Sequence, residues 1–262
     1  MNNKGHEKEE QELIEVIYIL WLRQIKHYWR SKARLLGSLG QPLLFLVTFG
    51  FGFGPMYTRA SGGADYMDFL APGIVSMSIL FTAVFSGLEV IWDRQFGFLK
   101  ETLVAPISRT EIMIGKTLGG ATIAMIQGLI VLSLTYVLGF RIPDLASLGL
   151  GLVFMFLIAI FFTGLGLAIA SKMKDMHGFQ LIMNFLIMPI FFLSGALFPL
   201  ENLPSAIYFI SRIDPLTYGV DGLRGAIAGI SMFGVYYDLA VIGLLSIIIC
   251  AVGTVFFSKT EA

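Results

Sequence analysis

Long apolar stretches alternate with short polar segments along this chain, and six of the stretches are long enough to cross a lipid bilayer. A crossing helix needs about 20 mostly apolar residues, because the hydrocarbon core is about 30 Å thick and each residue adds about 1.5 Å. No water is available there to satisfy backbone polar groups, so the stretches predict helices. The predicted spans are Leu35–Gly54, Leu70–Trp92, Thr117–Phe140, Leu145–Ser171, Met176–Leu200 and Leu239–Ser258.

The composition agrees with a membrane protein. Of the 262 residues, 56% are apolar and 14% are charged, whereas a soluble domain has about 25% charged residues. Even a soluble domain near this size leaves about a quarter of its unfolded surface exposed. These proportions exclude an ordinary cytosolic enzyme, a disordered chain and a nucleic-acid-binding protein. We therefore predict an all-α membrane protein with six transmembrane helices.

The basic residues are unevenly distributed, although the formal net charge is zero. With the N-terminus inside, 14 of the 18 Lys and Arg residues fall in inner segments, and the other four are Arg59, Arg141, Arg212 and Arg224. Cytoplasmic loops carry an excess of Lys and Arg. The pattern predicts a multi-pass protein of the cytoplasmic (inner) membrane with both termini in the cytoplasm. The first 34 residues carry twelve charges, so they are not expected to be a cleaved signal peptide.

The sequence before the first span predicts an amphipathic helix. We treat residues 1–34 as a cytoplasmic arm and residues 35–262 as the six-span domain. An apolar stripe at a spacing of three or four is formed by Leu13, Ile17, Trp21, Ile25 and Tyr28. Such a helix would lie on the inner membrane surface with its basic residues near anionic lipid. It is either a topology anchor or also a contact for a partner protein.

A second cytoplasmic segment, residues 93–116, is too polar to span the membrane. Phe96–Val104 predicts a short helix with an apolar strip, which ends before Pro106 because the residue preceding a proline is pushed out of α geometry. Ser108 or Thr110 is expected to cap the next helix, with Glu111 in its first turn. The apolar strip would either fit a groove in a partner or pack on the chain's own spans.

The outer segment Phe198–Asp238 is apolar but has no stretch long enough to cross. It predicts two half-helices that dip into the membrane, Leu203–Ile210 and Pro215–Ile230. Backbone of this kind is tolerated where protein or a water-filled cavity surrounds it. The ionisable residues of this segment either line an exit path or pair with one another, as Asp221 and Arg224 would at a spacing of three.

Few residues predict other chemistry. Glu89 is the one carboxylate well inside a span, and its role is structural or part of a pathway. Gly115-Lys116-Thr117 looks like the end of a phosphate-binding loop, but Thr110 stands where the first glycine is required. We predict no catalytic, cofactor-binding or metal site. Small residues at helix-packing spacing predict close contacts within the chain or at a dimer seam; they are Gly120, Ala124, Gly128, Gly166 and Ala170.

Two motifs resemble those of a known family. The segment at 92–120, WDRQFGFLKETLVAPISRTEIMIGKTLGG, is similar to the cytoplasmic signature of the membrane (permease) subunit of type-2 ABC transporters, of the drug-resistance and polysaccharide-export kind. The segment at 198–224, FPLENLPSAIYFISRIDPLTYGVDGLR, resembles the outer re-entrant segment of the same family. The order of the remaining pieces follows the same pattern over nearly the whole chain.

The resemblance implies a homodimer of permeases with two ABC ATP-binding subunits below it. ATP and Mg would be bound by those subunits, and no cofactor by this chain. The expected ATPase-coupling residues are Arg94, Phe96, Gly97, Phe98, Leu99, Lys100, Glu101, Leu103 and Pro106. The N-terminal helix is expected to contact the ATPase through Trp21, Arg23, Lys26 and Arg30. The expected pathway or outer-gate residues are Glu89, Asp214, Pro215, Tyr218 and Arg224.

The implied function is export of a hydrophobic or amphipathic substrate, such as a drug, a lipid or a lipid-linked glycan, by rocking of the permease dimer. One alternative is a secondary transporter or channel subunit, which would need interior charges in several spans. Another is a non-transporting membrane assembly protein, which would not need a docking helix opposite a re-entrant outer segment.

Overall fold

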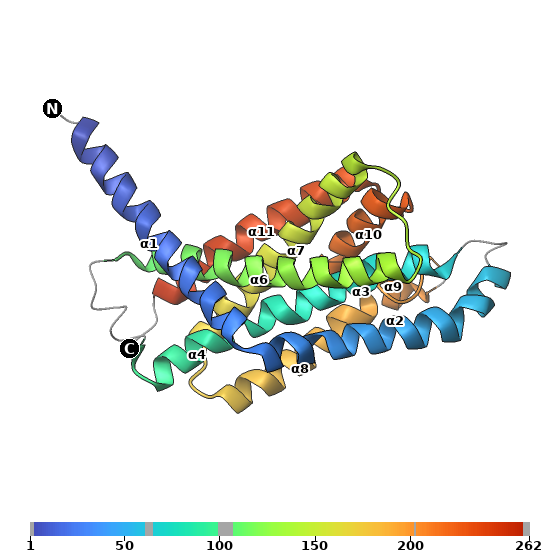
Figure 1. The fold of residues 1–262 in the computed structure, drawn as a ribbon, viewed down its shortest axis with the longest axis horizontal. Helices are drawn as coiled ribbons and strands as arrows, with labels where there is room; N and C mark the ends of the chain where they lie inside the picture. Colours follow the sequence, from blue (N-terminus) through green and yellow to red (C-terminus); the bar gives the residue numbers. More distant parts are fainter. Residues whose placement is uncertain (1–2, 61–64, 99–106, 202, 259–262) are drawn as a thin grey trace.

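The computed structural model describes residues 3–60, 65–98, 107–201 and 203–258, and within these ranges the chain is helical with no strand (Figure 1). Six helical segments are long and apolar enough to cross a membrane, which confirms the predicted all-α, six-span class. The helices are α1 (Asn3–Arg30), α2 (Lys32–Ala60), α3 (Tyr66–Phe85), α4 (Leu88–Gln95), α6 (Arg109–Val137), α7 (Leu145–Lys172), α8 (Met176–Leu193), α9 (Ser205–Ile213), α10 (Pro215–Ala228) and α11 (Val235–Ser258).

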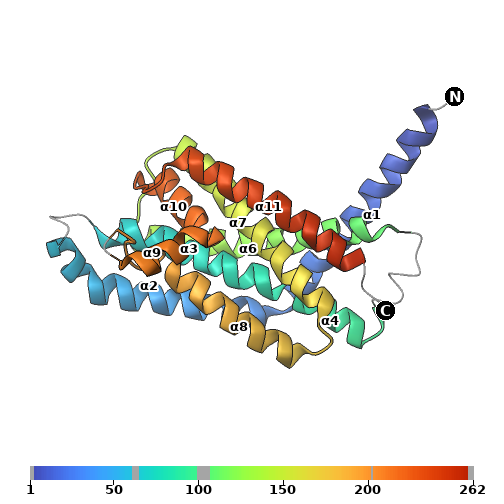
Figure 2. The same cartoon turned by 180° about the vertical axis from the view of Figure 1, so that it is seen from behind.

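Three of the spans form the centre of the bundle. Helices α3, α6 and α7 pack against one another. In their most apolar windows 72%, 56% and 61% of the residues are buried, against 11%, 22% and 17% for α2, α8 and α11. The last three helices therefore lie at the periphery and present most of their apolar surface outward. Figures 1 and 2 show an elongated bundle, with α1 and α4 at one end and α9 and α10 at the other.

Several helices begin at a polar residue that satisfies their first free N–H groups. Ser108, one of the two caps that the sequence predicted, caps α6, and it forms a reciprocal capping box with Glu111. Asp144 caps α7 and Asp175 caps α8 through backbone N–H groups. The N–H of Gly178, followed by that of His177, lowers the pKa of Asp175 below its usual range.

Two predicted inner boundaries differ from the structure. The second span covers Tyr66–Gln95, but its α-helical hydrogen bonding is interrupted at Ser86 and Gly87, between α3 and α4. At this break Gly87 lies against the backbone of Gly166 in α7, so close that a Cβ would meet the carbonyl oxygen at 2.5 Å. The third span begins at Arg109 instead of Thr117, because the capping box starts α6 two turns earlier.

The other boundaries shift by smaller amounts. The first span continues to Ala60, and the fifth ends at Leu193 instead of Leu200, where the chain enters turns around Gly195 with φ 76°. The sixth span begins at Val235, so Asp238 lies inside its first turn and is completely buried instead of lying in the outer loop.

The small residues of the spans serve contacts within the chain. A Cβ on Gly120 would meet the side chains of Ser86 and Thr163, and one on Gly128 would meet Ile79. In the same way a Cβ on Gly166 would collide with the carbonyl oxygen of Val84. These contacts support intramolecular packing of α3, α6 and α7, one of the two alternatives that the sequence left open.

Helix α1 packs along the start of α6. Leu20 and Gln24 are buried there, because Gly115 and Gly119 of α6 let the two helices approach closely. The packed face mostly follows the predicted apolar stripe, because Tyr28 is buried and Ile17, Trp21 and Ile25 are half-buried, but Leu13 is exposed and Leu20 and Gln24 join the buried face. The sequence could not show this, since a polar Gln does not look like a buried position.

Candidate functional site

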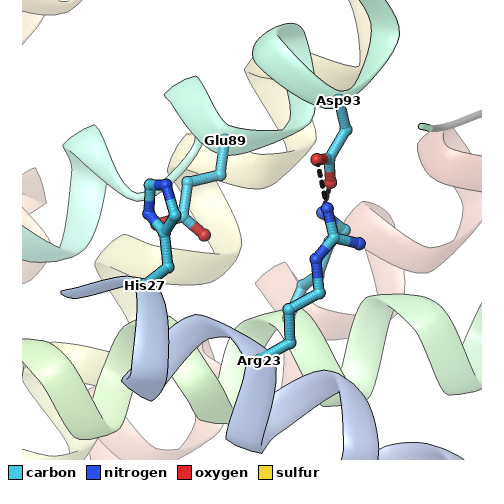
Figure 3. A network of polar contacts seen from close by, with 5 residues as sticks. Arg23, His27, Glu89 and Asp93 are labelled. Carbon is cyan, nitrogen blue, oxygen red and sulfur yellow. Dashed lines mark hydrogen bonds and ion pairs between the residues drawn. The ribbon is translucent and has the colours of Figure 1, made fainter. Parts of the chain in front are cut away.

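Helices α1, α4 and α6 meet through one carboxylate at the end of the bundle that the sequence predicts to be cytoplasmic. Asp93 of α4 accepts from Arg23 of α1, with 2.7 Å between Nη2 and Oδ1, and from Lys116 of α6, with 2.6 Å between Nζ and Oδ2 (Figure 3). Asp93 therefore links the two segments that the sequence assigned to partner contact. The sequence analysis did not single out this residue.

The burial of this network is uneven. The side chain of Lys116 is 5% exposed and that of Asp93 13%, whereas that of Arg23 is 46% exposed. A buried ammonium is costly unless it is paired, so the contact with Asp93 stabilises Lys116 in its buried position. Lys116 lies within the continuous helix α6 and is engaged by Asp93, an arrangement that no phosphate-binding loop has.

A second contact joins α1 and α4. His27 Nδ1 of α1 lies 4.0 Å from Glu89 Oε1 of α4 (Figure 3). The side chain of Glu89 is 16% exposed and that of His27 is 72% exposed. Glu89 thus sits at the α1–α4 contact near the inner end. A role in a pathway stays a prediction.

The predicted coupling segment begins with two exposed aromatic side chains. Helix α4 ends at Gln95, and Gly97 adopts φ 81°, which turns the chain. Phe96 and Phe98 are 63% and 51% exposed. The guanidinium of Arg23 lies 5.9 Å from the centre of the Phe98 ring, so the start of the segment is adjacent to α1. The remaining predicted coupling residues, Leu99, Lys100, Glu101, Leu103 and Pro106, lie outside the described residues.

The other predicted contact residues divide between inward and outward positions. Arg94 donates to the carbonyls of Met173 and Ser171 at 2.6 and 2.9 Å, which ties α4 to the end of α7. Trp21 donates its ring N–H to the hydroxyl of Thr122 in α6. Lys26 and Arg30 are exposed. Lys26 and Arg30 are therefore accessible to a partner protein, whereas Arg94 and Trp21 are engaged within the chain.

At the opposite end of the bundle, the two short helices α9 and α10 meet at the predicted junction. Asp214 caps α10 by accepting from the N–H of Leu216, and Pro215 occupies the first turn, where its missing N–H costs nothing. Thr217 donates to the carbonyl of Ser211, and Tyr218 to that of Arg212 at 2.6 Å. These bonds fix α9 and α10 into a hairpin.

The two charges predicted to pair each have other partners. Arg224 is 5% exposed and donates to the carbonyls of Phe69 and Gly195, with its guanidinium 3.8 Å from the Phe69 ring centre. Asp221 accepts from the N–H groups of Met232 and Phe233. Arg224 therefore ties α10 to α3, and Asp221 holds the turn that leads into α11.

Comparison with known proteins identifies relatives. The family described as ABC-2 type transporter matches residues 15–228. A protein named as a candidate transport permease, ycf38, of Cyanophora paradoxa is 31% identical over 213 residues, which cover 80% of this chain and 73% of the relative. Nodulation protein J of Rhizobium leguminosarum bv. trifolii is 30% identical over 214 residues, covering 81% and 78%. The inner membrane transport permease YadH of Escherichia coli (strain K12) is 25% identical over 217 residues, covering 81% and 82%.

Proposed function

The chain belongs to the ABC-2 type transporter family, since the family match spans most of its length, and we propose that it is the permease subunit of an ATP-driven exporter. Permeases of this family lack a nucleotide-binding domain. In our proposal two separate ATP-binding subunits bind ATP and Mg, and two copies of this chain form the path across the inner membrane. The cargo is a hydrophobic or amphipathic molecule such as a drug, a lipid or a lipid-linked glycan.

One observation carries this proposal: two exposed aromatic rings, Phe96 and Phe98, lie at one end of the bundle, and Phe98 lies beside Arg23 of the N-terminal helix. Exposed aromatic side chains next to an arginine are typical of the centre of a protein–protein contact. We infer that this surface and the segment after it form the contact with the ATP-binding subunit.

The polar network behind this surface supports the transmission of movement. Asp93 holds α1 and α6 together, and Arg94 holds α4 to the end of α7. A displacement of the Phe96–Phe98 surface would therefore move several helices as one body. In our proposal ATP-driven closure of the ATPases rocks the two permeases, and the α9–α10 hairpin with Asp214, Pro215, Tyr218 and Arg224 shapes the outer exit.

The test is the Phe98→Asp variant, assayed for co-purification with its ATP-binding partner subunit and for transport. We expect loss of association by about tenfold or more, because the change places a charge at the centre of an apolar contact. Phe98→Leu is the matched control and should retain association. Insertion and thermal stability should match the wild-type protein in both variants. Normal association and normal transport by Phe98→Asp would refute the proposed contact.

A further inference from the structure

A cavity of about 230 Å³ lies where the end of α1, the start of α2 and the inner half of α3 meet. Its wall includes Tyr28 of α1, Ser38 and Gln41 of α2, and Ser78, Phe81 and Thr82 of α3. None of these residues belongs to the proposed ATPase contact or to the outer hairpin.

The position of the cavity makes it accessible from the inner leaflet. On α3 it extends from Met77 to Phe85, the last residue before the break that precedes α4. On α2 it reaches the exposed residues Gly37 and Gln41, which lie in the first helical turns of α2. Helix α2 is peripheral, with 11% of its apolar window buried. A molecule in the inner leaflet would therefore meet the cavity from the side.

The described part of the wall combines hydrogen-bonding groups with apolar surface. Hydroxyl and amide side chains come from Ser38, Gln41, Ser78 and Thr82, and Phe81 adds an aromatic face. The described lining contains no Asp, Glu, Lys, Arg or His. A charged group entering this site would lose its hydration without gaining an opposite charge. The wall thus favours an uncharged group with hydrogen-bonding capacity.

Ser78 of the wall carries a hydroxyl that is not satisfied by the described residues. It is 3% exposed, and its hydroxyl has no hydrogen-bond partner among the described residues. Two residues earlier on the same helix, the hydroxyl of Ser76 donates to the carbonyl of Pro72 at 2.9 Å, which is the usual solution in an apolar helix. A buried hydroxyl without a partner is costly, so Ser78 is suited to bond a group inside the cavity.

Tyr28, another residue of the wall, is held in place by α6. Its hydroxyl donates to Oε1 of Gln127 in α6 at 2.9 Å, and the side chain is 1% exposed. This bond fixes the ring, so one side of the cavity is preorganised.

The size of the cavity limits what it holds. It is larger than a cavity of about 150 Å³, which accepts benzene, and smaller than the roughly 300–1,000 Å³ of a pocket that encloses a whole drug-sized ligand. It therefore fits one ring-sized portion of a molecule, and the remainder stays in the lipid beside α2.

We propose that this cavity binds the uncharged, hydroxyl-bearing head group of an amphipathic cargo taken from the inner leaflet. This inference rests on the proposed function and narrows it, because it restricts the cargo to amphipathic molecules whose head group carries no charge. Each permease copy would hold one head group before the path opens.

The experiment measures binding of a fluorescent monohexosyldiacylglycerol to the purified permease–ATPase complex without ATP. Ser78→Leu, which fills the cavity, should weaken binding by about tenfold or more, and the isosteric Thr82→Val should weaken it severalfold. Ser76→Ala is the matched control, because Ser76 lies outside the cavity wall, and it should bind as the wild-type protein does. Phosphatidylglycerol with the same acyl chains should bind at least about tenfold more weakly, because its head group is anionic.

Two results would overturn the inference: equal binding of the hexosyl lipid and phosphatidylglycerol, or unchanged binding by both Ser78→Leu and Thr82→Val. Thermal midpoints equal to that of the wild-type protein exclude misfolding as the cause of a loss. Because this assay does not depend on Phe98, its failure leaves the ATPase contact standing. Conversely, normal ATPase association and normal transport by Phe98→Asp would refute the proposed contact while the lipid site remained.

Discussion

Asp93 joins three helices at one end of the bundle. It accepts hydrogen bonds from two cations of very different exposure, Arg23 near the surface and Lys116 in the interior. An exposed pair contributes about 0–1 kcal/mol. A buried cation that loses its partner costs far more, because its desolvation is no longer offset. The two halves of the network therefore respond differently to mutation.

We expect Asp93→Asn to destabilise the protein by about 3 kcal/mol, because it leaves the ammonium of Lys116 buried without an opposite charge. Arg23→Gln should change stability by at most about 1 kcal/mol. The measurement is thermal unfolding of the purified protein in detergent. Adding Lys116→Met to Asp93→Asn should restore much of the loss, because the uncompensated charge is then gone. A stable Asp93→Asn variant with an unstable Arg23→Gln variant would contradict this assignment.

At the scale of helices, local signals were readable in the sequence and long-range partners were not. The Ser108 cap with Glu111 and the Asp214-Pro215 junction are local, because each involves residues within a few positions. In contrast, the buried face of α1 is set by glycines of α6 about a hundred positions away, which turn Gln24 inward. Such a face cannot be read from the periodicity of α1 alone.

The same limit applied to the candidate site. The exposed Phe96 and Phe98 follow from an apolar strip in a polar loop, which the sequence displays. The sequence did not indicate that Lys116 would be buried against Asp93, because the pairing depends on where α6 begins. Nor could it show that Arg224 would bond the carbonyls of Phe69 and Gly195, since that contact requires the packing of α10 on α3.

The crossing of α3 and α7 makes a prediction at this scale. Replacing Gly166 with Ala should lower stability by about 1–3 kcal/mol, because the added Cβ collides with the backbone carbonyl of Val84, which cannot move aside like a flexible side chain. Gly149→Ala on the same helix is the control, since a Cβ there meets nothing within 4 Å. The comparison uses thermal midpoints in detergent. Equal midpoints for the two variants would refute the close crossing.

At the scale of the whole molecule, the bundle has two chemically different ends. One end carries the exposed Phe96 and Phe98 and the charged network of α1 and α4. The other carries the α9–α10 hairpin, joined by backbone-directed hydrogen bonds. In our proposal the first end faces the cytoplasm and the ATPase, and the second faces outward, as the distribution of Lys and Arg predicts.

Cysteine labelling in intact cells tests this orientation. In a background where Cys250 is replaced by Ala, a cysteine at the exposed position Ser205 of α9 should react with a membrane-impermeant maleimide from outside. A cysteine at Ser108, also exposed, should react only after permeabilisation. The reverse pattern would overturn the orientation and, with it, the assignment of the two ends.

ATP dependence of transport is the most direct test of the account. The complete permease–ATPase complex would be reconstituted in proteoliposomes with a fluorescent monohexosyl lipid, and movement of the lipid from the ATPase-facing leaflet would be followed. We predict movement with ATP and Mg, and none with a non-hydrolysable ATP analogue, with the Phe98→Asp variant or with ion gradients alone. Movement of the lipid driven by an ion gradient without ATP would contradict the account.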